Sequence, residues 1–278
     1  MKKQIIVALS GLGLVLLMFL LGSNVQKKDP ASIPSKPAVT FSIQGYTDSL
    51  ETNLSPSQSA FLASIKKDLP QDSASRAAKF HEIARFWRDS LKAFEPFAYY
   101  TSEASKLENS EKSLTFAAHL MLDNLRMQQN EAVLGWHSNE TIDLFKRALI
   151  FNPESDDLRI GLGSAYIYGE GRAGNAEETM KGIQEILAVA NKDTTNMKAQ
   201  LVLGVGGMVS GQFDKARDRF LKVVANQPNN LEAIAYLADT YAALGERQEA
   251  IKWYNISKKL ADNAHYSREV DERIRQLK

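Results

Sequence analysis

The hydrophobic positions of this chain repeat mostly at helical spacing. One stripe consists of Phe80, Ile83, Ala84, Trp87 and Leu91. Residues separated by three, four and seven positions share one face of an α-helix, so this stripe predicts an amphipathic helix with its apolar face in a core. Further helices with short turns follow, and no stretch alternates apolar and polar residues as a half-buried strand does. The pattern therefore predicts an all-α fold.

Two shorter helices are predicted before this stripe. They extend from Tyr46 to Leu54 and from Ser57 to Leu69. Ser55 has the side chain of an N-cap, and Pro56 suits the first helical position, where no backbone donor is needed. Pro70 ends the second helix because proline cannot continue one.

An internal repeat with a spacing of 34 residues occupies the C-terminal part of the chain. The matched pairs are Leu203 with Leu237, Gly204 with Ala238, Gly211 with Gly245, Ala216 with Ala250, and Phe220 with Tyr254. An earlier copy, Leu162-Gly163, precedes the first of these by 41 residues. The additional residues are expected in turns, either at 169–174 or at 191–196. A fixed spacing of this length is typical of helix-turn-helix units that stack into a solenoid.

The repeated positions resemble the tetratricopeptide repeat family, whose motif reads W-x2-L-G-x2-Y, then A-x3-F, then P. The copy that fits best has Leu203, Gly204, Ala216, Phe220 and Pro228, and the next has Leu237, Ala238, Tyr241, Ala250 and Tyr254. In such a repeat, glycine or alanine lets the two helices approach closely, aromatic residues fill the space beside that contact, and proline ends the second helix. The resemblance implies a right-handed superhelix that binds proteins.

The spacing also divides the chain into units. About five repeats are expected between residues 73 and 264, after the N-terminal helices at 43–72, and the clearest copies are 156–196, 197–230 and 231–264. A last helix at 265–278 is rich in charged residues. A solvated outer face of this kind suits a helix that caps the end of a solenoid.

The N-terminus has the pattern of a membrane anchor. A short tail (1–4) with Lys2 and Lys3 precedes an apolar segment (5–22), and a linker (23–42) with three prolines follows. The apolar run lies at the short end of the length that spans a bilayer, so a transmembrane signal anchor is predicted. A cleaved signal peptide is the alternative, although Leu21 is bulky for its cleavage site.

The lysines that flank this segment give little bias for its orientation, because Lys27 and Lys28 oppose the two near the N-terminus. A short N-terminal tail suits a cytoplasmic N-terminus. We expect a single-pass protein of the bacterial inner membrane with its repeats in the periplasm. A repeat domain that faces the cytosol, as in organelle import receptors, is the alternative.

The composition excludes several kinds of site. The 34 Lys and Arg residues nearly balance the 33 Asp and Glu residues, which argues against nucleic acid as a partner. Because the chain has no cysteine, disulfides, thiolate zinc sites and a cysteine nucleophile are excluded. No cofactor and no metal ion are expected.

Two short motifs resemble cofactor or catalytic signatures but lack the context that such sites need. Gly169–Gly174 matches G-x-G-x-x-G, which binds a dinucleotide after a strand, whereas here a helix precedes it and a turn is expected. His81-Glu82 begins a zinc-protease motif, but Arg85 occupies the place of the second histidine. The four histidines, all expected at the surface or in a groove, are His81, His119, His137 and His265. The chain is therefore predicted not to be an enzyme.

The concave groove of the repeats is the expected partner-binding site, because in this family it is lined by first-helix residues that face away from the second helix. Transferring that helical phase selects Arg126, Asn130, Ile160, Ser164, Ile167, Lys198, Leu201, Val205, Met208, Glu232 and Asp239. The apolar middle and charged ends of this surface suit an amphipathic helix or an extended peptide. Packing of Leu201 and Val205 into the superhelix interior is the alternative.

The order of anchor, linker and repeats resembles that of membrane-anchored bacterial repeat proteins that act as scaffolds or assembly factors. The predicted function is therefore the capture of a partner's peptide or helix in the groove, with the partner unidentified. A repeat domain that associates with itself within an envelope assembly is the competing hypothesis.

Overall fold

The computed structural model describes residues 41–278, which contain thirteen α-helices, two short π-helical segments and no strand. The α-helices are α2 (Ile43–Glu51), α3 (Pro56–Lys67), α4 (Ser73–Phe86), α5 (Phe94–Glu108), α6 (Glu111–Met127), α7 (Glu131–Phe151), α8 (Asp156–Tyr166), α9 (Ala176–Lys192), α10 (Met197–Val209), α11 (Phe213–Asn226), α12 (Leu231–Ala243), α13 (Arg247–Ala261) and α14 (Ala264–Gln276). The π-helical segments are η2 (Trp87–Leu91) and η3 (Ile167–Gly171).

The predicted tail (1–4), the predicted anchor (5–22) and nearly all of the predicted linker (23–42) lie outside the described residues. Between residues 41 and 278, no helix combines the length and the apolar character that crossing a bilayer requires.

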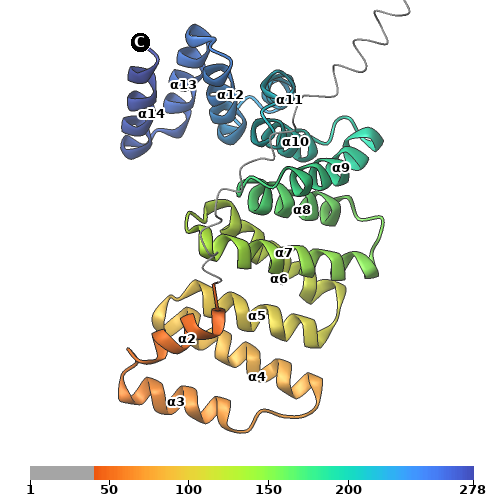
Figure 1. Ribbon diagram of the computed structural model, residues 1–278, viewed down its shortest axis with the longest axis vertical. Helices are drawn as coiled ribbons and strands as arrows, with labels where there is room; N and C mark the ends of the chain where they lie inside the picture. The colour runs from red at the N-terminus through yellow and green to blue at the C-terminus, as the bar shows by residue number, and fades with distance from the viewer. Residues whose placement is uncertain (1–40) are drawn as a thin grey trace, which may run out of the picture. The chain divides into compact units, whose positions relative to one another are not determined.

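Ten of the helices form five hairpins between residues 73 and 264. The pairs are α4 with α5, α6 with α7, α8 with α9, α10 with α11, and α12 with α13. Each hairpin packs on the next through its second helix, α3 packs on α4, and α14 covers the outer side of α13 (Figure 1). The predicted all-α solenoid is confirmed for the described part of the chain.

Polar side chains fix where the helices begin. The predicted start of α3 is confirmed: Ser55 Oγ accepts the Gln58 amide, the Gln58 side chain accepts the Ser55 amide, and Pro56 opens the helix. The helix before it begins at Ile43, three residues earlier than predicted, because Ser42 Oγ accepts the Gly45 amide. Five later helices begin after an asparagine whose side chain accepts backbone amides: Asn130, Asn175, Asn196, Asn230 and Asn263.

The repeat glycines lie where two helices touch, as the motif predicted. A Cβ built on Gly204 would lie 2.4 Å from the ring of Phe220, and one built on Gly163 would lie 2.7 Å from the carbonyl oxygen of Gly182. Any side chain at these positions would separate α10 from α11 or α8 from α9. The close contact of the two helices therefore depends on the absence of a side chain.

Most of the extra residues of the 41-residue repeat lengthen its helices, so the expectation that all of them lie in turns is wrong. The first helix has 11 α-helical residues followed by the five of η3, whereas α10 has 13. The second helix, α9, has 17 residues, whereas α11 has 14. A π-helical turn absorbs inserted residues without ending the helix, which leaves only 172–174 as the turn within 169–174.

The core is continuous from α5 to α14, and a second cluster lies at the N-terminal end. In that second cluster Ile83, Ala84 and Trp87 are buried, as the helical stripe predicted, together with Leu62 and Ile65 of α3. The aromatic ring of Phe145 belongs to the main cluster and occupies the space beside Gly161.

One of the four histidines contradicts the expectation of a surface position. His137 is fully buried, its ring contacts Phe94 and Trp136, and neither ring nitrogen has a hydrogen-bond partner among the described residues. It lies inside because it shares one face of α7 with Val133 and Thr141, which are also buried.

Candidate partner-binding surfaces

Three of the predicted groove residues do not reach the surface. Ile160, Ser164 and Ile167 are buried, and the hydroxyl of Ser164 donates to the carbonyl oxygen of Ile160 at 2.7 Å. The reason is that α6 and α10 both pack on α8, so the first helices of neighbouring repeats cover this face. The prediction that these residues contact a partner is therefore wrong.

Leu201 and Val205 follow the alternative that the sequence left open. Both are buried, with 8% and 5% of their surface exposed, and both belong to the main core. Met208, one turn further along α10, is half-buried and remains accessible. The apolar middle of the predicted groove is thus mostly core, and Met208 is the part that a partner can touch.

Lys198 is exposed and belongs to a polar row along the first helices. Its Nζ atom lies 2.5 Å from Asp157, and Nε2 of His119 lies 2.9 Å from the other oxygen of the same carboxylate. The hydrogen bond from His119, together with that from Lys198, lowers the pKa of Asp157 well below its usual range. This row links α6, α8 and α10 along one edge of the concave face.

Arg126 and Glu232, at opposite ends of the predicted groove, lie in direct contact. Nη2 of Arg126 donates to Oε1 of Glu232 at 2.8 Å and to the hydroxyl of Tyr168 at 3.0 Å. The guanidinium also lies over the Tyr168 ring, 4.8 Å from its centre. The bond joins α6 to α12 across the intervening repeats and closes the middle of the groove.

The last two predicted residues have structural partners. Asn130 is exposed, and its side chain caps α7 by accepting the amides of Ala132 and Val133. Asp239 accepts the hydroxyl of Tyr254 and Nη1 of Arg273, each at 2.6 Å, and so joins α12 to α13 and α14.

Two depressions remain open on the concave side, and both include Tyr236. The first has a volume of about 220 Å³ and is lined by Arg126, Tyr168, Arg172, Val205, Met208, Val209 and Tyr236. The second has a volume of about 140 Å³ and is lined by Glu232, Ala235, Tyr236, Asp239, Tyr254, Tyr266, Glu269, Val270 and Arg273. The first depression has two arginines and no carboxylate, whereas the second has three carboxylates and one arginine, so the charge of the lining changes from positive to negative across Tyr236.

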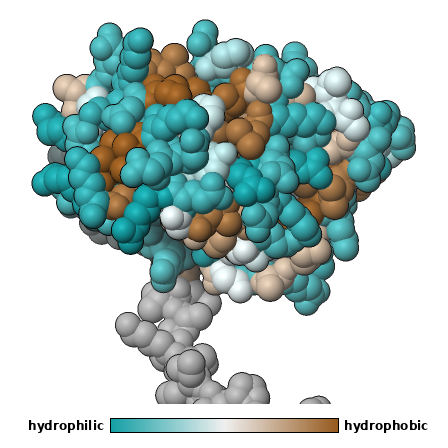
Figure 2. Space-filling view, turned by 90° about the horizontal axis from the view of Figure 1, so that it is seen from above, coloured by the Kyte–Doolittle hydropathy of each residue, from teal (hydrophilic) through white to brown (hydrophobic). Residues whose placement is uncertain are grey.

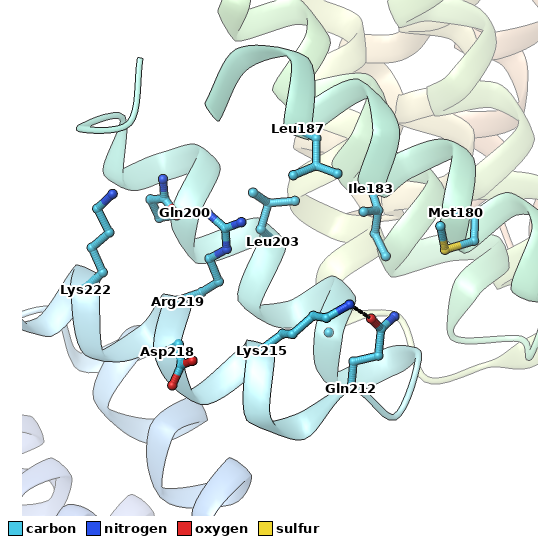
Figure 3. Close-up of a pocket in the computed structure, with 11 residues that line it drawn as sticks. Met180, Ile183, Leu187, Gln200, Leu203, Gln212, Lys215, Asp218, Arg219 and Lys222 are labelled. Carbon is cyan, nitrogen blue, oxygen red and sulfur yellow. Dashed lines mark hydrogen bonds between the residues drawn. The ribbon is translucent and has the colours of Figure 1, made fainter. Parts of the chain in front are cut away.

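A further groove, which the sequence reasoning missed, lies between the second helices α9 and α11 and is about 610 Å³ in volume. Met180, Ile183 and Leu187 of α9 face Lys215 and Arg219 of α11 across it, with α10 as its floor (Figure 3). A signal for it was present in the sequence, since α9 carries these three apolar residues beside its buried stripe at Gly182, Ile186 and Val189. An apolar arc this wide exceeds what one packed neighbour covers.

Apolar side chains are also visible on the outside of the repeats. Seen from above, from the side of α12 to α14, apolar patches are separated by hydrophilic side chains (Figure 2). Large hydrophobic residues that are exposed include Met127, Phe116, Ile150, Phe151 and Met180.

The fold and these surfaces define an α-helical solenoid of the protein-interaction scaffold type, and members of this class are typically not enzymes. A family model described as tetratricopeptide repeat matches residues 209–268. Together with the 34-residue motif and the five stacked hairpins, this match supports tetratricopeptide repeats in the C-terminal part of the chain.

Several known proteins are similar to this chain in sequence or in structure. Human tetratricopeptide repeat protein 6 is 24% identical over 127 residues, which are 46% of this chain and 24% of that protein, so the match spans about a quarter of the relative's length. The crystal structure of TTC0263, a thermophilic TPR protein of Thermus thermophilus, has a TM-score of 0.51 at 15% identity and covers 74% of this chain and 97% of its own. PilW, described as a type IV pilus biogenesis factor, has a TM-score of 0.46 at 16% identity and covers 72% of this chain and 92% of its own.

Proposed function

We propose that this protein is a membrane-tethered scaffold that binds a segment of a partner protein on the concave surface around Tyr236. The observation that carries the proposal is the meeting of two open depressions at this tyrosine, beside the half-buried Met208. Tyrosine and arginine side chains in partly desolvated pockets are the residues that most often dominate binding energy in protein interfaces. The resemblance to the repeat family suggests protein binding as the class of function, and we assign the binding site to this surface.

The chemistry of the surface suits a short segment with an apolar centre. Met208 and Tyr236 offer apolar contact, and burial raises the pKa of Tyr236 above its ordinary value. On one side Arg172 borders the first depression, and on the other Glu269 borders the second. A partner segment with an acidic residue at one end and a basic residue at the other would match both sides.

The membrane tether of the proposal rests on the sequence. The apolar segment 5–22 follows two lysines, and the linker 23–42 contains Pro30, Pro34 and Pro37. A proline-bearing linker acts as an extended spacer. In this arrangement the anchor holds the repeats near the membrane, on its periplasmic side, and the concave surface selects the partner.

The first test uses a single charge on the concave surface. In Met208→Glu a charged group would replace the apolar contact beside Tyr236. We therefore expect the yield of partner crosslinked from native membranes to fall about tenfold, with the photoreactive residue placed at position 235, where Ala235 lines the second depression. Met127→Glu is the matched control, because Met127 is 80% exposed and lines neither depression. Circular dichroism of both variants checks that the helices are intact.

An equal yield of the same partner from Met208→Glu and from the unchanged protein would refute the concave site. Crosslinks at position 235 that join two copies of this chain would instead support the self-association hypothesis.

A further inference from the structure

The groove between α9 and α11 has a different character from the concave surface, and the two sites use different residues of α10. Both walls pack on α10, and among the described helices α9 and α11 do not pack closely on each other. Leu203 and Gly207 of α10 form its floor, and α11 packs closely there, because a Cβ on Gly207 would lie 3.1 Å from Cβ of Ala216. The result is an open channel of about 610 Å³ bordered by two helices.

The α9 wall of this channel is apolar. Met180, Ile183 and Leu187 follow one another at spacings of three and four residues, so they form a stripe along one face of α9. Met180 is 45% exposed, and the other two are half-buried. Ile183 and Leu187 pack partly on the main core, and the rest of the stripe faces the open groove.

The α11 wall is positively charged, and its charges have no carboxylate partner. Lys215, Arg219 and Lys222 share one face of α11, and none of them lies within 4.0 Å of a carboxylate of residues 41–278. Neutral amides orient two of them: Nζ of Lys215 donates to Gln212 Oε1 and Nη1 of Arg219 donates to Gln200 Oε1, each at 2.6 Å.

The remaining cation of α11 shows that this lack of carboxylate partners is confined to the groove wall. Arg217, which does not line the groove, pairs with Asp214 at 3.1 Å and with Asp218 at 3.0 Å. The single carboxylate of the groove wall, Asp218, is therefore already engaged by a cation outside it. The three lining cations leave a net positive wall opposite an apolar one.

We propose that this groove binds an amphipathic helix of a partner protein that has apolar residues on one flank and acidic residues on the other. A helix laid between two helices presents side chains at spacings of three, four and seven residues, which matches the stripe Met180, Ile183 and Leu187. Carboxylates on its second flank would pair with Lys215, Arg219 and Lys222, where water is partly excluded. The wall charges thus select an acidic helix over a basic one.

This inference goes beyond the concave surface, because no residue that lines this groove lines either concave depression. The two sites can therefore be occupied together, and the scaffold would connect two partners. Each site can also fail its test while the other passes.

The absence of cysteine permits a direct test with the full-length chain in phosphatidylcholine nanodiscs. A fluorophore attached to Gln184→Cys would report occupancy, because Gln184 is exposed on α9 and does not line the groove. The probes are two synthetic helical peptides with the same leucines at i, i+3 and i+7, one with glutamate and one with lysine on the second flank. We expect the acidic peptide to bind about tenfold more tightly, as two or three partly desolvated ion pairs would provide.

Charge reversal gives the decisive variant. Lys215→Glu with Arg219→Glu should reverse the preference between the two peptides, whereas Met180→Glu should weaken both. The matched control is Lys252→Glu with Lys259→Glu on α13, where both lysines are exposed and outside the groove, and it should leave the preference unchanged.

Several outcomes would overturn the proposal. Equal binding of the acidic and basic peptides, or an equal effect of the α13 control, would show that the wall charges select nothing. A fluorescence change that depends on protein concentration without peptide would assign the groove to a second copy of this chain. A response of the label to empty nanodiscs of anionic lipid would assign it to a lipid surface.

Discussion

At the scale of single residues, His137 has the most unusual environment in the described structure. Burial lowers its pKa to about 4, and no charged group contributes to the shift. The sequence contained the information to place it, since His137 lies on the same helical face as Val133, Leu144 and Ala148. A histidine viewed alone suggests a surface or a ligand position, whereas the stripe that contains it indicates a core position.

The neutral state of His137 predicts a pH dependence of stability. In the unfolded chain the imidazole binds a proton near pH 6.5, and in the folded chain only near pH 4. The contribution of neutral His137 to the free energy of unfolding is therefore complete above pH 6.5 and is lost as the pH falls toward 4. The shift corresponds to roughly 3 kcal/mol. His137→Leu removes the titrating group, and we expect its melting temperature to fall less than that of the unchanged protein between pH 7 and pH 4.

The control for this experiment is His81→Gln, because His81 is half-exposed and lies 2.8 Å from Glu108 at the surface. It should retain the acid sensitivity of the unchanged protein. If His137→Leu lost stability in acid as steeply as the unchanged protein does, the buried imidazole would not be its cause.

At the scale of helices, the repeat motif identified contacts but not lengths. Gly204 and Phe220 meet as their spacing predicts, because close helix packing constrains residue size at fixed positions. The position of an insertion is not constrained in this way. Residues added near Gly169 could lengthen a turn or a helix, and the choice of η3 depends on the contacts of the folded state, such as that of Gly169 with Ser138. Such contacts have no signature in sequence spacing.

The helix contacts predict opposite effects for two glycines. Gly163→Ala would press a methyl group against the carbonyl oxygen of Gly182 and against Ile186, so we expect a loss of about 1–3 kcal/mol. Gly135→Ala is the matched control on α7, where a Cβ would have nothing within 4 Å. That change should stabilise the protein by about 0.5–1 kcal/mol, because it only restricts the unfolded chain and favours the helix.

Thermal unfolding of both alanine variants, followed by circular dichroism, measures the difference. Equal melting temperatures would show that α8 and α9 can move apart without cost.

At the scale of the whole repeat domain, the packing of neighbouring first helices determines which predicted site residues are accessible. Of the positions that the helical spacing of the family selected, Met208 and Lys198 on α10 are accessible. Ile160 and Ile167 are not, because α6 and α10 close over α8. The rotation between successive repeats accumulates from many small packing choices, so a single sequence does not reveal how far the first helices approach one another.

The contacts of the capping helix α14 predict how strongly the stability of the last hairpin depends on it. Val270 and Ile274 of α14 are buried against the preceding hairpin, while the outer face of this helix is charged. Val270→Asp would place an unpaired carboxylate in that contact, and we expect it to release α14 and to lower the stability of the last hairpin by about 2–4 kcal/mol. Arg268→Asp, an exposed change on the same helix, should have little effect.

Hydrogen exchange locates this effect along the chain. Because repeats interact mainly with their neighbours, exchange should accelerate in α12 and α13 and remain unchanged in α4 to α7. Uniform acceleration across all five hairpins would show that the domain unfolds as one unit.

The bond between Arg126 and Glu232 has a consequence for the order of folding. Hairpins of a solenoid form from contacts that are close in sequence, and such local contacts assemble quickly. This bond instead joins residues 106 positions apart, and its loop cannot close until the hairpins between α6 and α12 have stacked in their final rotation. It is therefore among the last contacts to form as the chain folds, and its formation marks the completion of the superhelix.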